Sequence, residues 1–216
     1  MEAATVRQPR AQTPSQSQAE PLASAPGSIA DPAPLGLAAF ALTTFVLSMF
    51  NAGLVSENAG PVAFGLALAY GGLAQLLAGM WEFRNNNTFG ATAFTSFGAF
   101  WLSFWAFQQF FADGIKSETD LGHGVGLYLI AWGIFTAYMW IASFRVSVAV
   151  NAVFLLLMIT FFVLGIGDAA AKESIVKIGG YIGIATAAVA WYASFAGVTN
   201  KTFGRIVLPV KELSSK

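Results

Sequence analysis

Polar side chains that can bind a small solute recur at helical spacing inside long apolar stretches of this sequence. Between residues 35 and 54, one stripe of a helix carries Thr43, Thr44, Ser48 and Asn51, with Phe40 at its start. In hydrocarbon an unsatisfied polar group costs several kcal/mol, so these side chains must face protein or a water-filled path. Hydroxyls and amides can replace water around a small solute while holding it weakly, as conduction requires. The stripe therefore predicts a pore lining.

Two further apolar stretches repeat this pattern. The second carries Gly71, Gln75, Gly79 and Glu82, and the third carries Thr88, Thr92, Thr95, Ser96, Ala99 and Ser103. Small residues also serve as packing residues between membrane helices, which remains an alternative for any single Ser, Thr or Gly. A buried amide needs up to four partners, so Asn51 and Gln75 favour a pore or a network that supports one. The expected polar lining is Thr43, Thr44, Ser48, Asn51, Gln75, Thr92 and Thr95.

Glu82 is the ionisable residue of these stripes, and its position leaves two interpretations open. It ends the second stretch and lies near Arg84 in the sequence, which is compatible with a solvated ion pair at the membrane surface. Carboxylates within membrane-spanning segments also serve in proton relays, so a proton-handling role is the alternative.

The composition indicates a membrane protein and excludes several kinds of chemistry. Of 216 residues, 56% are hydrophobic and 10% are charged, whereas charged residues make up about 25% of soluble domains. The net charge of zero provides no basic surface for nucleic acid. The absence of cysteine removes disulfides, thiolate nucleophiles and Cys-ligated metals, and one histidine leaves little metal or haem chemistry. We expect neither a cofactor nor a metal site.

Six apolar stretches of about 20 residues follow one another, and each is long enough to cross a hydrocarbon core of about 30 Å as a helix. The sequence therefore predicts an all-α membrane protein with six transmembrane helices. The stretches are Leu35–Leu54, Pro61–Trp81, Phe89–Phe111, Gly122–Ser143, Val146–Ile166 and Ile175–Val198.

Lys and Arg set the expected orientation, because acidic residues contribute little to topology. One side holds Arg7, Arg10, Arg84, Arg145, Lys201, Arg205, Lys211 and Lys216, and the other holds Lys116, Lys172 and Lys177. This count of Lys and Arg predicts that both termini are cytoplasmic. The protein is then a multi-pass protein of the plasma (inner) membrane. The outer face is then acidic, with Glu57, Asp113, Glu118, Asp120, Asp168 and Glu173.

The expected domain organisation is a transport domain between two tails. Residues 1–30 are rich in Ala, Gln, Ser and Pro and contain no apolar run of signal-peptide length, so they are expected to form a disordered cytoplasmic tail. Residues 31–200 form the six-span domain, and residues 201–216 form a cytoplasmic C-terminal tail.

The ten residues from Asp31 to Phe40 read D-P-A-P-L-G-L-A-A-F, with two prolines where a helix tolerates them, at its start. This string resembles the signature N-P-[AV]-P-[LF]-G-L-x-[GSA]-F of the acetate uptake transporter family, which includes bacterial succinate-acetate permeases and yeast acetate transporters. Nine of the ten positions fit, and Asp31 replaces the usual Asn. Residues 70–79, 87–96 and 203–209 are also similar to that family.

The resemblance implies a homohexameric ring of six-span subunits with a separate path through each protomer. It also implies transport of acetate and related short-chain monocarboxylates, with succinate as a further candidate, by proton-coupled uptake or channel-like permeation. Members of the family place three bulky residues at a constriction near the middle of the membrane. The family motif places these three residues at Phe40, Phe97 and Leu157 of this sequence. Phe97 replaces the usual Tyr and lacks its hydroxyl. Leu157 is assigned by its spacing alone.

Three other functions compete with transport, and we expect that the protein is not an enzyme. A channel for small neutral solutes such as urea would also use amides and apolar slots. A membrane enzyme would need a cluster of ionisable groups inside the bilayer, and the sequence offers only edge residues such as Glu82 and Asp168. A purely structural membrane protein would give no reason for buried amides.

Overall fold

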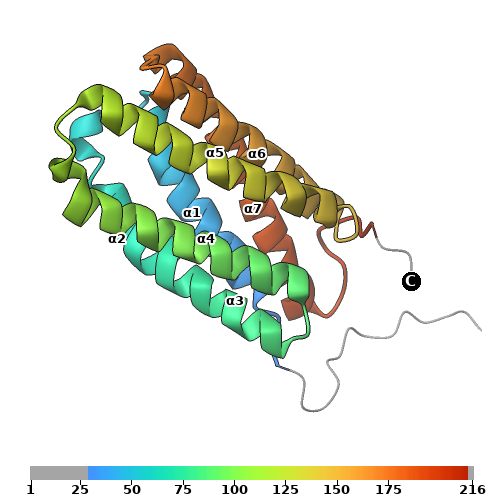
Figure 1. Ribbon diagram of the computed structural model, residues 1–216. Coiled ribbons are helices and arrows are strands. Elements are labelled where there is room, and N and C mark those ends of the chain that lie inside the picture. The colour runs from blue at the N-terminus through green and yellow to red at the C-terminus, as the bar shows by residue number, and fades with distance from the viewer. Residues whose placement is uncertain (1–28, 214–216) are drawn as a thin grey trace, which may run out of the picture.

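Seven α-helices make up the part of the chain that the structure, a computed structural model, describes: residues 29–213 (Figure 1). A π-helical segment, Ala69–Ala74, joins the second helix to the third, and another, Phe107–Phe111, extends the fourth. The helices are α1 (Ala33–Asn51), α2 (Val62–Leu68), α3 (Gln75–Arg84), α4 (Thr88–Ala106), α5 (Glu118–Ser143), α6 (Val148–Ala169) and α7 (Glu173–Phe203).

Five helical rods in this part of the chain are long and apolar enough to cross a membrane: α1, the α2–α3 rod, α5, α6 and α7. These confirm five of the predicted spans as helices of sufficient length and hydropathy. The remaining stretch forms α4, a helix of 19 residues that lies beside α3. Its hydroxyl groups and glycines lower its hydropathy, so a sixth crossing stays a prediction.

Most helix boundaries differ from the predicted ones by a few residues, and two of these differences have a clear local cause. Helix α5 begins at Glu118, earlier than expected, because the Ser117 hydroxyl accepts a hydrogen bond from the Asp120 N–H at 3.2 Å and caps the helix. Helix α7 continues past Val198 to Phe203 and ends at Gly204, whose φ of 63° is left-handed. Residues 1–28 of the predicted N-terminal tail lie outside the described residues.

The helices pack in a closed circuit. Helix α5 lies against α6, α6 against α7, α7 against α1, and the α2–α3 rod fills the place between α1 and α4 (Figure 1). Aromatic rings complete the circuit between α4 and α5, where the centroid of Phe100 lies 5.6 Å from that of Tyr128 and 5.3 Å from that of Trp132. The hydroxyls of Ser103 and Tyr128 are hydrogen-bonded at 2.7 Å across the same contact.

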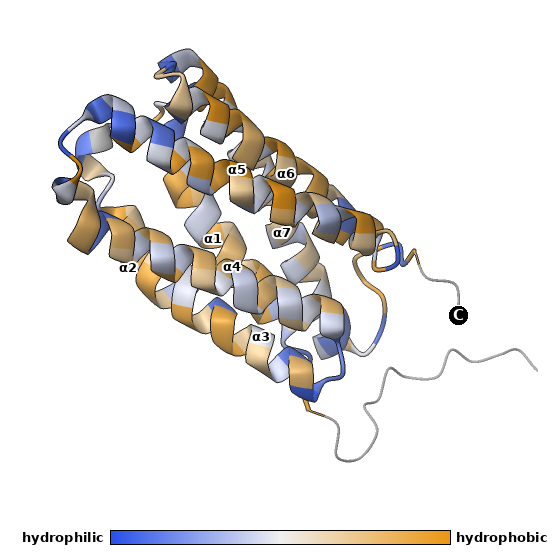
Figure 2. Cartoon of the chain, in the orientation of Figure 1, coloured by the Kyte–Doolittle hydropathy of each residue, from blue (hydrophilic) through white to orange (hydrophobic). Residues whose placement is uncertain are grey.

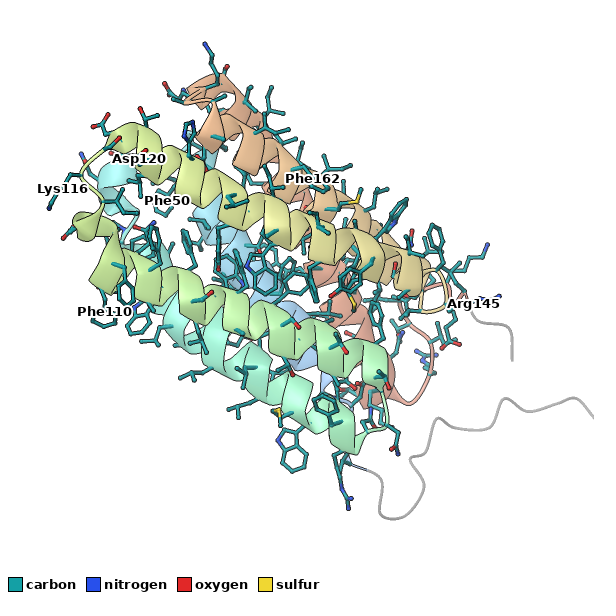
Figure 3. The ribbon with its side chains drawn as sticks, in the orientation of Figure 1. Phe50, Phe110, Lys116, Asp120, Arg145 and Phe162 are labelled. Atoms are coloured by element: carbon teal, nitrogen blue, oxygen red, sulfur yellow. The ribbon has the colours of Figure 1, made fainter. Side chains whose placement is uncertain are left out.

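The bundle has two polar ends and a mostly apolar middle (Figure 2). Arg145 marks one end, which also holds the α3–α4 turn and the start of α1, and Lys116 marks the other, which also holds the α6–α7 turn (Figure 3). We name these the Arg145 end and the Lys116 end.

Close backbone approach between helices depends on glycine in this fold. A Cβ atom added to Gly98 of α4 would lie 2.6 Å from the backbone nitrogen of Leu76 in α3. Gly180 of α7 lies against the backbone of Ala52 in the same manner. Small residues at such contacts let membrane helices pack by van der Waals contact.

The segment after α7 is hydrogen-bonded to the bundle at the Arg145 end. The side-chain oxygen of Asn200 accepts hydrogen bonds from the N–H groups of Val207 at 2.7 Å and Leu208 at 2.9 Å. The N–H of Val148 then donates to the carbonyl of Lys211 at 2.8 Å. The segment therefore ties the end of α7 to the beginning of α6.

Candidate functional site

A cavity of about 370 Å³ lies between α1, α4, α5, α6 and α7. It reaches from the middle of the bundle to the Lys116 end. Helix α1 lines it with Phe40, Thr44, Leu47, Ser48 and Asn51, and α6 lines it with Leu157, Thr160, Phe161, Leu164 and Asp168.

The linings from α1 and α6 follow the same order. Each begins with a bulky apolar residue, Phe40 or Leu157, and ends eleven residues later with a polar one, Asn51 or Asp168. Both helices run from the Arg145 end to the Lys116 end, and eleven residues of helix span about 16 Å. The cavity is therefore apolar at its inner limit, hydroxyl-lined in between and polar at its rim.

The three residues expected at the constriction are buried near this inner limit. Phe40, Phe97 and Leu157 are 3 to 4% exposed, and the centroids of Phe40 and Phe97 are 6.0 Å apart at an interplanar angle of 48°. Phe40 and Leu157 line the cavity, whereas Phe97 does not and contacts the ring of Phe40. The ring of Phe97 also contacts those of Phe135 and Phe154, at centroid distances of 5.4 and 6.0 Å.

Two residues of the lining carry hydrogen-bond donors without a partner among the described residues. The Thr44 hydroxyl and the Trp101 indole N–H are both buried and unpaired, and their side chains are 6% and 3% exposed. By contrast, the Thr160 hydroxyl already donates to the carbonyl of Leu156 at 2.8 Å. A buried donor without a partner is costly, and a ligand that accepts hydrogen bonds would remove that cost.

Of the predicted lining residues, Thr44, Ser48 and Asn51 line the cavity, and the remaining four do not. The Thr43 hydroxyl donates to the carbonyl of Ala39 at 2.9 Å, and its side chain packs against Gly71 of the α2–α3 rod. Thr95 packs against Gly79 of α3. Gln75 is 1% exposed, and its side-chain oxygen has no partner in the described part of the chain. Neither Gln75, Thr92 nor Thr95 lines the cavity.

Glu82 is buried at the Arg145 end. Its side chain has no exposed surface, one carboxylate oxygen lies 3.5 Å from the Asn85 side-chain nitrogen, and the other has no partner among residues 29–213. A Cβ atom at Gly90 would lie 2.7 Å from that second oxygen, so the first turn of α4 covers it. Arg84 is exposed two residues further on. The interpretation of Glu82 as a solvated ion pair is therefore wrong.

Several residues of the cavity were not predicted. Trp101, Thr160, Phe161, Glu118 and Asp168 line it, and no stripe was assigned to α6. The spacing of Leu157, Thr160, Phe161, Leu164 and Asp168 is that of one helix face, which is the signal that identifies them. This spacing was not recognised as a cavity lining because most of these residues are apolar, as is usual for a membrane helix. The described residues contain no group of three His, Cys, Asp or Glu that could hold a metal ion.

Comparison with known proteins gives relatives over most of the chain. Ammonia transport outward protein 2 of Saccharomyces cerevisiae is 44% identical over 176 residues, which cover 80% of this chain and 62% of that protein. This chain thus spans less than two thirds of that relative's length. Succinate-acetate/proton symporter SatP of Escherichia coli (strain K12) is 38% identical over 184 residues, covering 85% of this chain and 96% of the symporter.

A solved structure has the same fold. The structure of the bacterial acetate channel SatP superposes with a TM-score of 0.79 at 36% sequence identity, covering 85% of this chain and 99% of that one. These relatives carry the names of transport proteins rather than enzymes. Together with the five apolar helices, they show a multi-pass membrane protein.

The family model for GPR1/FUN34/yaaH matches residues 15–215, nearly the whole chain. The resemblance seen in the string from Asp31 to Phe40 is confirmed by this match and by the relatives named above. This chain therefore belongs to the GPR1/FUN34/yaaH family.

Proposed function

We propose that this protein carries acetate and related short-chain monocarboxylates across the membrane through the cavity between α1, α4, α5, α6 and α7. The observation that carries the proposal is the pair of unpaired buried donors, on Thr44 and Trp101, in a cavity that ends at Phe40 and Leu157. A carboxylate that reached these two donors would accept hydrogen bonds from both, and its methyl group would face the apolar inner limit. The names of the bacterial symporter and channel support this substrate.

The lining suits passage rather than tight capture. Among residues 29–213, neither lysine, arginine nor histidine lines the cavity, so a carboxylate would meet hydroxyl, indole and amide groups without a full positive charge. Such groups replace part of the hydration shell of the anion, and a weakly bound ion can leave again. The constriction then selects by size and favours a solute with a short apolar end.

The proposed membrane arrangement has six crossings, with α4 as the third. The Arg145 end faces the cytoplasm of the plasma membrane, supported by the excess of Lys and Arg on that side of the sequence. Both termini are then cytoplasmic. Six subunits form a ring in which each protomer has its own path, as the sequence resemblance implies.

Glu82 is the proposed proton-handling group. It is fully buried near the cytoplasmic end, and one of its oxygens has no partner among the described residues, so a proton can be bound there. Glu82→Gln keeps the size of the side chain and one acceptor oxygen for Asn85, and removes its titration. We expect acetate uptake by this variant to lose its response to an imposed pH gradient. An unchanged response would exclude Glu82 from proton coupling.

The test of transport is uptake of labelled acetate into liposomes that contain the purified protein, with and without a pH gradient. Trp101→Phe keeps a ring and removes the N–H, and we expect uptake at low acetate concentration to fall about fivefold. Trp81→Phe is the matched control, because Trp81 is 57% exposed and lies outside the cavity. Uptake that does not exceed that of empty liposomes would reject the function.

A path for a small neutral solute is the second candidate. The name of the yeast relative refers to ammonia, and the oxygen of an amide such as urea can also accept from Thr44 and Trp101. The same liposomes separate the two candidates. Faster uptake of urea or ammonia than of acetate at equal concentration, without an effect of the pH gradient, would favour the neutral solute.

A further inference from the structure

Two carboxylate side chains lie on the rim of the cavity at the Lys116 end. Glu118 is the first residue of α5, and Asp168 belongs to the last turn of α6, and both line the cavity. A Cβ atom at Gly122 would lie 2.7 Å from the carbonyl oxygen of Asp168, so the two helices touch there. Glu118 precedes Gly122 by one turn and shares its helix face. The two acids therefore lie on one side of the same opening.

The rest of the rim does not neutralise these charges. Asn51 and Gln108 line it with neutral amides, and Val176 of α7 lines it with an apolar group. Glu118 and Asp168 are the charged residues among those that line the cavity within the described chain.

Other charged or titratable groups lie at this end without lining the cavity. Lys177 forms an ion pair with Glu173 at 2.5 Å, and its side chain lies over Gly53. The Lys116 ammonium donates to the carbonyl of Asp113 at 2.6 Å. Asp120, His123 and Lys172 are exposed. A solute that enters at the Lys116 end consequently meets negative charge first and the unpaired donors of Thr44 and Trp101 afterwards.

We infer that Glu118 and Asp168 discriminate against dicarboxylates, so that this path admits monocarboxylates and excludes succinate and its homologues. The inference rests on the proposed function. Electrostatic energy scales with the product of the charges, so a dianion at the rim meets twice the repulsion that a monoanion meets. A dicarboxylate bound by Thr44 and Trp101 through one end would also direct its second carboxylate back toward the two acids. The name of the bacterial symporter includes succinate, and this chain would differ from it in that respect.

The experiment measures uptake of labelled acetate and labelled succinate into liposomes that contain the full-length protein, at a pH of about 7.5, where carboxylates are ionised. We expect the double variant Asp168→Asn with Glu118→Gln to raise the succinate-to-acetate ratio about fivefold. Asp168→Glu keeps the charge and should keep the original ratio.

Asp120→Asn is the matched control. Asp120 is an exposed acid near the start of α5, at the same end of the bundle, and does not line the cavity (Figure 3). Its neutralisation removes one charge from this end and should leave the ratio unchanged. Raised salt screens exposed charges, so it should increase the ratio for the unmodified protein more than for the double variant.

The two levels of the hypothesis fail in different ways. If the unmodified protein takes up no acetate, the proposed function is wrong. If acetate uptake persists in every variant but the double variant leaves the ratio unchanged, the rim does not select by charge. An equal shift of the ratio by Asp120→Asn would likewise overturn the inference, because the effect would then come from the general charge of this end.

Discussion

The contact between α3 and α4 and the cavity at the Lys116 end use the same residue types for opposite purposes. In the contact, Thr95 packs directly against Gly79, and the two helix backbones nearly touch. Neither the Thr95 nor the Thr44 hydroxyl has a partner among the described residues, but Thr44 borders the empty volume of the cavity. The difference lies in the residue opposite. A glycine lets a neighbouring helix close over a threonine, whereas the cavity beside Thr44 is lined by the large side chains of Trp101 on α4 and Phe161 on α6.

The largest effect should come from forcing the close contact apart. Gly98→Leu places a side chain where the backbone nitrogen of Leu76 lies, so we expect a loss of stability of about 3 kcal/mol and little monodisperse protein in detergent. Gly65→Leu is the control, because nothing lies within 4 Å of a Cβ atom at that position. Similar yields and melting temperatures for both variants would show that the contact is loosely packed.

The next effect concerns the width of the cavity. Leu157→Ala removes a side chain from the apolar inner limit, so larger acids should pass more easily, and we expect the lactate-to-acetate uptake ratio to rise about tenfold. Leu164→Ala makes the same change two turns away, nearer the rim, and should alter the ratio much less. Equal ratios in the two variants would place the narrowest point elsewhere.

Phe40→Ala should raise the lactate-to-acetate ratio as Leu157→Ala does. Phe97→Tyr should change the rate of acetate uptake more than this ratio.

A neighbouring pair of threonines tests the polar lining. Thr44→Val and Thr43→Val remove the same hydroxyl from adjacent positions of α1. We expect acetate uptake to fall about threefold for Thr44→Val, because a donor to the solute is lost. Uptake by Thr43→Val should stay near that of the unmodified protein, since this hydroxyl only bonds to Ala39 of its own helix. The measurement is initial uptake at matched protein level, and a greater loss for Thr43→Val would contradict the assignment.

The smallest effect is expected where α4 meets α5. Tyr128→Phe removes the hydroxyl that is bonded to Ser103 and to the carbonyl of Phe100, while the aromatic packing remains. Hydrogen bonds between membrane helices average about 0.6 kcal/mol, so the melting temperature in detergent should fall by only a few degrees. Tyr138→Phe is the control, because Tyr138 is 54% exposed. A large loss of stability would mean that this bond, rather than the rings, closes the circuit.

The sequence alone was sufficient to predict an all-α membrane fold and the approximate limits of five apolar helices, since long apolar stretches leave few alternatives in a membrane, whereas the sixth crossing stays a prediction. Three of the predicted lining residues, Thr44, Ser48 and Asn51, border the cavity, and their contact with a solute stays a prediction. The sequence could not separate Thr44 from Thr43. Adjacent residues of a helix differ by about 100° in direction, and only the tertiary structure shows which direction meets another helix.

The burial of Glu82 could not be predicted for a related reason. A carboxylate at the end of an apolar stretch is usually solvated, and the sequence gives no sign that the next helix folds back over it. That covering depends on Gly90, which lies in the first turn of α4 and leaves room for the carboxylate oxygen. The same applies to Asp168, whose position on the rim follows from the packing of α6 against α5.

The π-helical segment Ala69–Ala74 has a consequence for the lengths that this chain can tolerate. Buried residues along the α2–α3 rod recur every four positions, at Ala63, Ala67, Gly71, Gln75 and Gly79. In a regular α-helix, residues four positions apart differ by about 40° in direction around the helix axis. Over several such intervals the last residues of the series would therefore turn toward the lipid. The wider turn absorbs this drift and keeps the series on one face. Deleting a single residue here would turn Gln75, Gly79 and Glu82 by about 100°, so insertions and deletions in this segment should be tolerated far less well than substitutions at its exposed Leu73.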